Sequence, residues 1–157
     1  AGDEATFTTL GDALIDIILE LDRLAATYAP YLLGTWVRSA ERWGQTDADR
    51  QRLSENARLL VTTWSTPDND LLNDYSGRFW SGLLSGFHAP RWRMFLDAGP
   101  DDAHIDQVLQ EWETAWVRDA GPFPTEPIGD THQVATTLLE QYGPEPAHAE
   151  RPASSGS

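Results

Sequence analysis

The stretch LGDALIDIILELDRLAATYAPYLLGTWVRSA, residues 10–40, indicates the fold class of the chain. Its apolar residues recur at intervals of three and four, which is the period of an amphipathic helix. Pro30 divides the stretch, because the residue before a proline is displaced from helical geometry while proline itself fits the first turn of a helix. We therefore expect one helix that ends before Pro30 and a second that begins there and stops near Gly44.

The helical period continues toward the C-terminus and predicts four further helices. Thr46, followed by Asp47 and Asp49, has the pattern of an N-cap with favourable first-turn charge. Pro90 is expected to kink or end the fourth helix. The expected spans are residues 47–64, 71–87 with apolar surface continuing to residue 96, 101–116, and a short last helix through residue 142 capped by Asp130 or Thr131.

Glycines interrupt the apolar stripe of the fourth predicted helix at Gly77, Gly82 and Gly86. A glycine inside a helix costs roughly 1 kcal/mol relative to alanine. Three of them in one helix predict that another backbone approaches it closely.

Six helices joined by short connections predict an all-α fold, a bundle of mostly antiparallel helices over residues 1–143. A chain of 157 residues is long enough for one hydrophobic core and too short for two. Residues 144–157 are rich in Pro, Ala and Ser, and we expect them to form a disordered tail.

Charge and composition exclude several classes of function. The 25 acidic residues against 11 basic ones give a formal net charge of −14, which would repel the phosphates of a nucleic acid. No stretch approaches the roughly 18 apolar residues of a membrane-spanning helix. The absence of cysteine excludes a disulfide framework and a thiolate metal site, and we expect neither a metal nor another cofactor.

The chain carries none of the common signatures of a catalytic site. Its four histidines are far apart, and neither a zinc-protease helix, a phosphate-binding loop nor a nucleophile elbow is present. The seven tryptophans are the more unusual feature, since aromatic rings can hold a sugar face but also dominate cores and domain interfaces. We expect such an excess to leave an apolar patch exposed when a partner domain is missing.

A longer segment carries a family resemblance. Residues 54–96 read SENARLLVTTWSTPDNDLLNDYSGRFWSGLLSGFHAPRWRMFL. This segment resembles the helical C-terminal region of α-N-acetylglucosaminidases, and the resemblance extends in order over about residues 7–144. The family motifs correspond to Asn56 with Arg58, Trp64 to Pro67, Asp74 with Tyr75, Trp80 to Leu83 and Phe87 to Trp92. Two departures are a Ser-Thr-Pro turn after Trp64 in place of Gly-Pro, and Phe87-His88 in place of a tyrosine pair.

The resemblance implies an enzyme of three parts, in which a helical C-terminal domain packs on a catalytic (β/α)₈-type barrel. Such an enzyme removes terminal α-linked N-acetylglucosamine with retention, through two glutamates on the barrel, and a secreted parent is suspected. A barrel needs roughly 250 residues and strands, so this chain cannot contain it. The resemblance therefore implies an accessory domain without catalytic residues, whose partners are the barrel and, through the parent enzyme, terminal α-linked N-acetylglucosamine glycans.

Within this resemblance, a few residues are candidates to face the substrate cleft or the barrel. They are Trp64, Asp74, Tyr75, Trp80, Arg91 and Trp92. Each has a structural alternative: Asp74 favours a helix N-terminus, Tyr75 lies on an apolar stripe, and Trp92 can pack across the Pro90 kink. For the whole chain, the alternative functions are a stand-alone helical interaction module and a carbohydrate-binding module.

Overall fold

A computed structural model describes residues 2–64, 77–99 and 101–143, and this part of the chain is helical. Its elements are α1 (Gly2–Ala25), the 3₁₀ turn η1 (Ala29–Tyr31), α2 (Leu33–Glu41), α3 (Asp47–Leu59), the π-helical turn η3 (Leu84–His88), α4 (Ala89–Ala98), α5 (Ile105–Asp119) and α6 (Thr131–Tyr142). The predicted all-α class is confirmed. The predicted break at residues 65–70, the start of the fourth helix at residues 71–76 and the tail at residues 144–157 lie outside the described residues.

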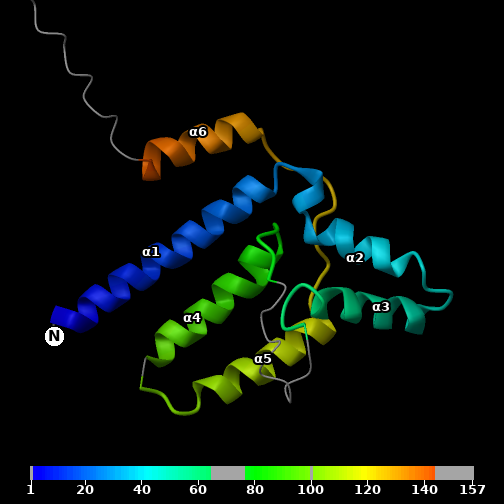
Figure 1. Cartoon of the computed structure of the whole chain (residues 1–157), viewed down its shortest axis with the longest axis horizontal. Coiled ribbons are helices and arrows are strands. Elements are labelled where there is room, and N and C mark those ends of the chain that lie inside the picture. Colours follow the sequence, from blue (N-terminus) through cyan, green and yellow to red (C-terminus); the bar gives the residue numbers. More distant parts are fainter. Residues whose placement is uncertain (1, 65–76, 100, 144–157) are drawn as a thin grey trace, which may run out of the picture.

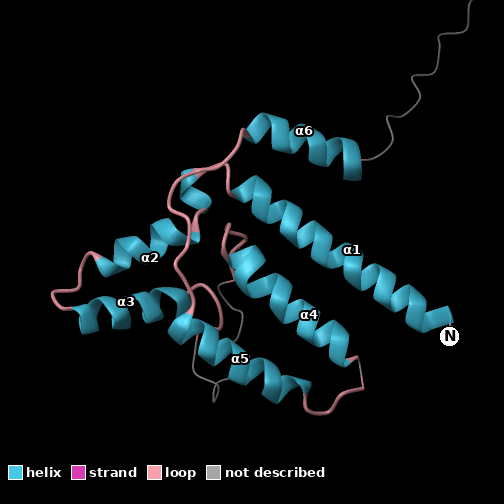
Figure 2. Ribbon diagram, turned by 180° about the vertical axis from the view of Figure 1, so that it is seen from behind, coloured by secondary structure: helices cyan, strands magenta, loops and turns pink. Residues whose placement is uncertain are grey.

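The helices form an antiparallel arrangement in which α6, α1, α4 and α5 lie side by side in that order (Figure 1). The α2–α3 hairpin lies to one side of this row, next to the ends of its helices, and joins it through contacts between α3 and α5 (Figure 1). The view from behind shows the same order, with α6 at one edge (Figure 2). The predicted antiparallel packing is therefore confirmed, and α6 lies beside α1 at the edge of the molecule.

Two buried clusters hold the helices together. The first joins α2, α3 and η3, with partly buried aromatic residues of α5 against it. The second joins α1 to η3 and α4. The π-helical turn serves both clusters, because Phe87 is buried in the first and Leu84 in the second. This short turn is therefore the central packing element of the fold.

The chain enters that turn through a junction with α1 and with the segment before α2. Leu32 and Ser81 form an isolated parallel bridge, in which the Ser81 N–H donates to Tyr31 O at 2.8 Å and the Leu33 N–H donates to Ser81 O at 3.0 Å. The Asp22 carboxylate accepts hydrogen bonds from the N–H of Gly82 at 2.7 Å and of Ser85 at 3.0 Å. Asp22 on α1 thus caps the start of a helix about sixty residues away in sequence.

Because of this junction, the predicted fourth helix is wrong in its middle part. Residues 77–82 are not helical, and Phe79, placed on the apolar stripe of that helix, is 76% exposed. The extended bridge at Ser81 prevents a helix there, and Gly82 follows it with a φ of 86°, a conformation that favours glycine.

The close approach of another backbone, predicted at the glycines of the fourth helix, is not found at Gly82 or Gly86. A β-carbon added at Gly82 or Gly86 would meet side chains first, at 3.4 Å and 4.0 Å respectively. Gly34 at the start of α2 is a crowded position, since a β-carbon there would lie 2.6 Å from the carbonyl oxygen of Phe123, in a segment far away in sequence. A side chain at Gly34 would displace the segment that leads from α5 toward α6.

Other helix boundaries differ from the prediction for local reasons. Pro30 lies in the separate turn η1, and α2 begins only at Leu33 because Leu32 is extended in the bridge. The third helix ends at Leu59 rather than at Trp64, whose backbone has a φ of 64°. Pro90 follows the wide π-helical turn and lies in the first turn of α4, where its missing N–H needs no acceptor.

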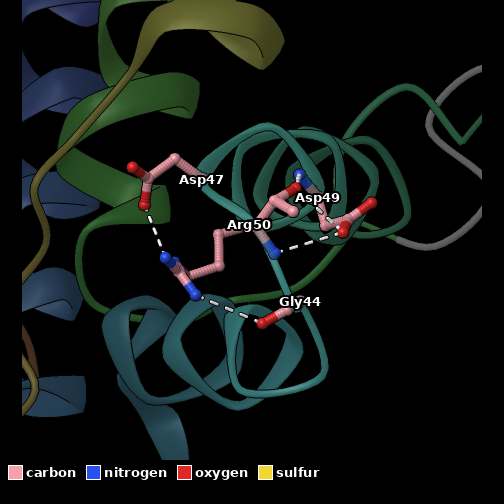
Figure 3. A network of polar contacts seen from close by, with 5 residues as sticks. Gly44, Asp47, Asp49 and Arg50 are labelled. Carbon is pink, nitrogen blue, oxygen red and sulfur yellow. Dashed lines mark hydrogen bonds and ion pairs between the residues drawn. The ribbon is translucent and has the colours of Figure 1, made fainter.

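The predicted cap of α3 is confirmed (Figure 3). Thr46 and Asp49 exchange hydrogen bonds in a capping box, and the bonds from Thr46 lower the pKa of the Asp49 carboxyl below its usual 3.8. Arg50 donates to Gly44 O at 3.2 Å and contacts Asp47 at 2.5 Å. These contacts close the turn of the α2–α3 hairpin.

Replacement of Asp22 tests the junction. Asp22→Ala leaves the Gly82 and Ser85 amides without their acceptor, and should lower the free energy of unfolding by about 1–3 kcal/mol. Chemical denaturation followed by circular dichroism measures this change. Asp16→Ala, at an exposed position of the same helix, is the control. Equal effects of the two substitutions would contradict a capping role for Asp22.

Candidate functional site

The described residues hold no group of three His, Asp or Glu side chains placed to bind a metal ion. No helix in the described ranges is long and apolar enough to cross a membrane. The candidate site residues lie in different surroundings. Of these, Asp74 and Tyr75 lie outside the described residues.

Trp80 forms an aromatic pair with Trp36. Their ring centroids are 5.9 Å apart with the planes tilted by 59°. Trp80 immediately precedes the Ser81 bridge and packs, partly buried, against the first core cluster. The Trp36 indole N–H donates to Ala57 O at 2.8 Å, which fixes the second ring against α3. The pair presents a rigid, partly exposed aromatic surface that could pack on a sugar face or on another domain.

Trp36 is missing from the candidates chosen by sequence, although it takes part in this pair. The helical period places it on the core stripe of the second helix, but it is exposed. Its contact with Trp80 and its hydrogen bond to Ala57 both join residues distant in sequence, so the sequence pattern did not identify it.

Trp64 ends the turn that follows α3. Its N–H donates to Leu59 O at 2.9 Å, and its positive φ is rare for a residue with a large side chain. The indole ring is exposed. An exposed ring on an unusual backbone conformation suits a residue that contacts a ligand or a neighbouring domain.

Arg91 joins α4 to α5. Its Nε lies 2.5 Å from Glu113 Oε1, and Glu113 is buried. The guanidinium carbon also lies 6.0 Å from the centroid of the Phe87 ring, within the range of a cation–π contact. This arrangement favours a packing role for Arg91 over contact with substrate.

Trp92, the next residue, is exposed and packs edge-on against Phe95 of its own helix, with centroids 5.9 Å apart. Neighbouring residues on a helix point about 100° apart, so the side chains of Trp92 and Arg91 lie on different faces of α4. The structure therefore gives Trp80, Arg91 and Trp92 separate partners, and it does not bring them together in one pocket.

Arg58, from the Asn-x-Arg motif, is the most completely buried cation described. It donates to Val117 O at 2.6 Å, to Arg118 O at 2.8 Å and to Ser54 Oγ at 2.6 Å. It thereby satisfies carbonyls at the C-terminal end of α5, where a positive charge is favoured. Burial lowers the pKa of the Arg58 guanidinium, while Glu55, Glu41 and Asp119 act in the opposite direction.

A cavity of about 440 Å³ lies beside Arg58, between α2, α3 and the segment after α5. Arg38 bridges its rim by donating to the Thr125 hydroxyl, and Glu41 lines its wall. The sequence pattern gives no sign of this cavity, because its lining comes from segments about eighty residues apart.

A comparison with protein families shows to which family the chain belongs. The family model described as the α-N-acetylglucosaminidase C-terminal domain matches residues 1–141. The chain belongs to this family. The match covers nearly all of the described residues, and it agrees with the resemblance seen in residues 54–96.

Known relatives are much longer than the chain. Human α-N-acetylglucosaminidase is 28% identical over 138 residues, which are 82% of this chain and 18% of the human protein. A family 89 glycoside hydrolase from Clostridium perfringens, solved with 2-acetamido-1,2-dideoxynojirimycin, is similar in structure with a TM-score of 0.74 and 28% identity. That match covers 86% of this chain and 17% of the clostridial enzyme.

A second structure of the clostridial enzyme was solved with its substrate GlcNAc-α-1,4-galactose. It gives a TM-score of 0.75 with 28% identity, over 88% of this chain and 17% of the enzyme. The chain therefore spans less than one fifth of each of these relatives.

The role of Arg91 can be tested through its partner. Glu113→Ala leaves the Arg91 charge without its carboxylate between α4 and α5, and should lower the free energy of unfolding by about 3 kcal/mol. The double variant Arg91→Met with Glu113→Leu removes both charges and should recover most of that loss. Thermal and urea denaturation measure both variants. A double variant with the same free energy of unfolding as Glu113→Ala would contradict the claim that the unpaired charge causes the loss of stability.

Proposed function

We propose that this chain is the helical C-terminal part of an exo-acting, retaining α-N-acetylglucosaminidase, inactive alone and acting with a catalytic domain that it does not contain. One observation carries the proposal: the match to the clostridial enzyme covers 86% of this chain but 17% of that enzyme. Retaining hydrolysis needs two carboxyl groups about 5–5.5 Å apart at the scissile bond. The proposal assigns those groups, and the barrel that carries them, to the remaining part of the enzyme.

Residues 1–143 are the proposed domain, and residues 144–157 the proposed tail. The relatives support terminal α-linked N-acetylglucosamine as the substrate class, because the clostridial enzyme was solved with GlcNAc-α-1,4-galactose. Ligand sites commonly lie at domain junctions, so the helical part would form one wall of the cleft.

Exposed aromatic residues are the best candidates for that wall. Trp64 and the Trp80–Trp36 pair combine an exposed ring with a backbone fixed by hydrogen bonds. Asp74 and Tyr75, which lie outside the described residues, and the exposed Trp92 remain candidates to face the cleft or the barrel. Arg91 is better explained by its contact with Glu113.

A chimeric enzyme tests the proposal. The region of the clostridial enzyme that matches this chain is replaced by residues 1–143, and hydrolysis of an aryl α-N-acetylglucosaminide is compared with that of the truncated enzyme. The chimera should exceed the truncated enzyme by at least about tenfold, and the isolated chain should not exceed a heat-inactivated sample, because positioned groups supply the rate. Turnover by the isolated chain, or a chimera no better than the truncated enzyme, would contradict the proposal.

Variants of the same chimera test whether Trp64 contacts the substrate or only contributes to packing. Trp64→Ala should raise the KM of the chimera for the aryl substrate. It should change the melting temperature little, because the ring that it removes is exposed. Trp43→Ala is the control, because Trp43 is 82% exposed and lies outside the motif residues. An unchanged KM in the Trp64 variant would remove Trp64 from the proposed cleft wall.

A further inference from the structure

Phe79 is 76% exposed, yet its ring packs on another aromatic ring. It stacks on His88, with the ring centroids 6.4 Å apart and the planes inclined by 29°. The His88 ring in turn meets Phe87 edge-on, with centroids 5.4 Å apart, and Phe87 is buried in the first core cluster. Three rings therefore lead from the core to the surface, and they restrict the movement of the outermost one. Such a ring loses little side-chain entropy when it binds a ligand.

The backbone on both sides of Phe79 is also fixed. His88 Nε2 lies 3.2 Å from Arg78 O, and it donates this hydrogen bond because a carbonyl oxygen can only accept. Two residues after Phe79, the Ser81 N–H donates to Tyr31 O in the parallel bridge. The contacts of His88 and of the bridge thus position Phe79 through its ring and through its backbone.

The hydrogen bond to Arg78 depends on a residue at which the chain departs from the family pattern. That pattern has a tyrosine pair where this chain has Phe87 and His88. A tyrosine ring has no nitrogen that could donate to Arg78 O from the same place. The arrangement therefore points to a property that can differ between family members. For an exo-acting enzyme, the sugar that leaves is such a property, because the enzyme specifies the terminal sugar.

The surface around Phe79 suits a sugar better than a protein partner. Its neighbours in the chain, Gly77 and Arg78, are exposed and add no large apolar surface, whereas a stable protein interface buries more than about 1,000 Å². A single aromatic ring is about the size of one sugar ring. Its face carries partial negative charge, which attracts the C–H groups on the apolar face of a sugar.

We propose that Phe79 binds the sugar on the leaving-group side of the scissile bond in the substrate of the assembled enzyme, and that His88 is the positioning residue for the Phe79 ring. The ligand is a pyranose that stacks its apolar face on Phe79. This inference rests on the proposed function, and it adds a contact on the far side of the bond from the terminal N-acetylglucosamine.

Two substrates of the chimera test the contact. One is GlcNAc-α-1,4-galactose, with which the clostridial enzyme was solved, and the other is N-acetyl-α-glucosaminyl fluoride, whose leaving group is a single atom. Phe79→Ala should lower the ratio of kcat/KM for the disaccharide to kcat/KM for the fluoride by about three- to tenfold, because the fluoride has no second ring to stack. Phe79→Tyr keeps the aromatic ring and should keep the ratio. Trp43→Ala, which removes an exposed ring elsewhere, is the control.

A double-mutant cycle tests the role of His88. His88→Leu should lower the same ratio, and a partial loss of folded enzyme cancels because it lowers both rates equally. The double variant Phe79→Ala with His88→Leu should have the ratio of Phe79→Ala alone, since His88 acts through the Phe79 ring. Independent effects that multiply in the double variant would contradict the positioning role.

The outcomes separate this inference from the proposed function. An active chimera whose ratio is the same with and without the Phe79 ring overturns the sugar contact and leaves the function standing. A ratio that falls as far in Phe79→Tyr or in Trp43→Ala as in Phe79→Ala also overturns it. An unmodified chimera no more active than the truncated enzyme contradicts the proposed function, and the inference falls with it.

Discussion

Asp22 of α1 accepts hydrogen bonds from the amides of Gly82 and Ser85, and the bridge between Leu32 and Ser81 lies beside this contact. The arrangement of the helices depends on this junction, because the last turn of α1 and the segment before α2 both meet residues 81–85 there. It involves the last turn of α1, lies directly before α2 and caps the helical segment that leads into α4. A carboxylate that accepts amide bonds at a helix start favours a single geometry, so the junction specifies the relative positions of these elements.

The packing extends outward from the junction through the π-helical turn. Phe87 and Leu84, three residues apart, enter different core clusters, so the turn joins the α2–α3–α5 side of the molecule to the α1–α4 side. Pro90 is compatible with this turn because it lies in the first turn of α4. Beyond the two clusters, the outer face of α1 and the whole of α6 remain poorly covered. This incomplete outer layer supports the proposal that the chain acts together with a further domain.

Local sequence signals predicted the helices and several of their ends. The period of three and four placed the apolar faces, and the caps at Thr46 and Asp130 are present because a cap depends only on the next few residues. The bridge at Ser81, the Arg58 contacts with the end of α5 and the pairing of Arg91 with Glu113 could not be predicted, since each joins distant segments. For the same reason the family motif identified Arg58, but not its role. Among the candidate site residues, Trp80 needed the structure to reveal its partner Trp36.

Native-state hydrogen exchange of the Gly82 and Ser85 amides tests the central claim most directly. If the junction holds the fold together, these amides should open only when the whole chain unfolds, and their exchange should be among the slowest in the molecule. Amides of α6, which has no fully buried residue, should exchange much faster through local opening. Exchange of Gly82 and Ser85 as fast as that of α6 would contradict the claim that the contact with Asp22 organises the structure.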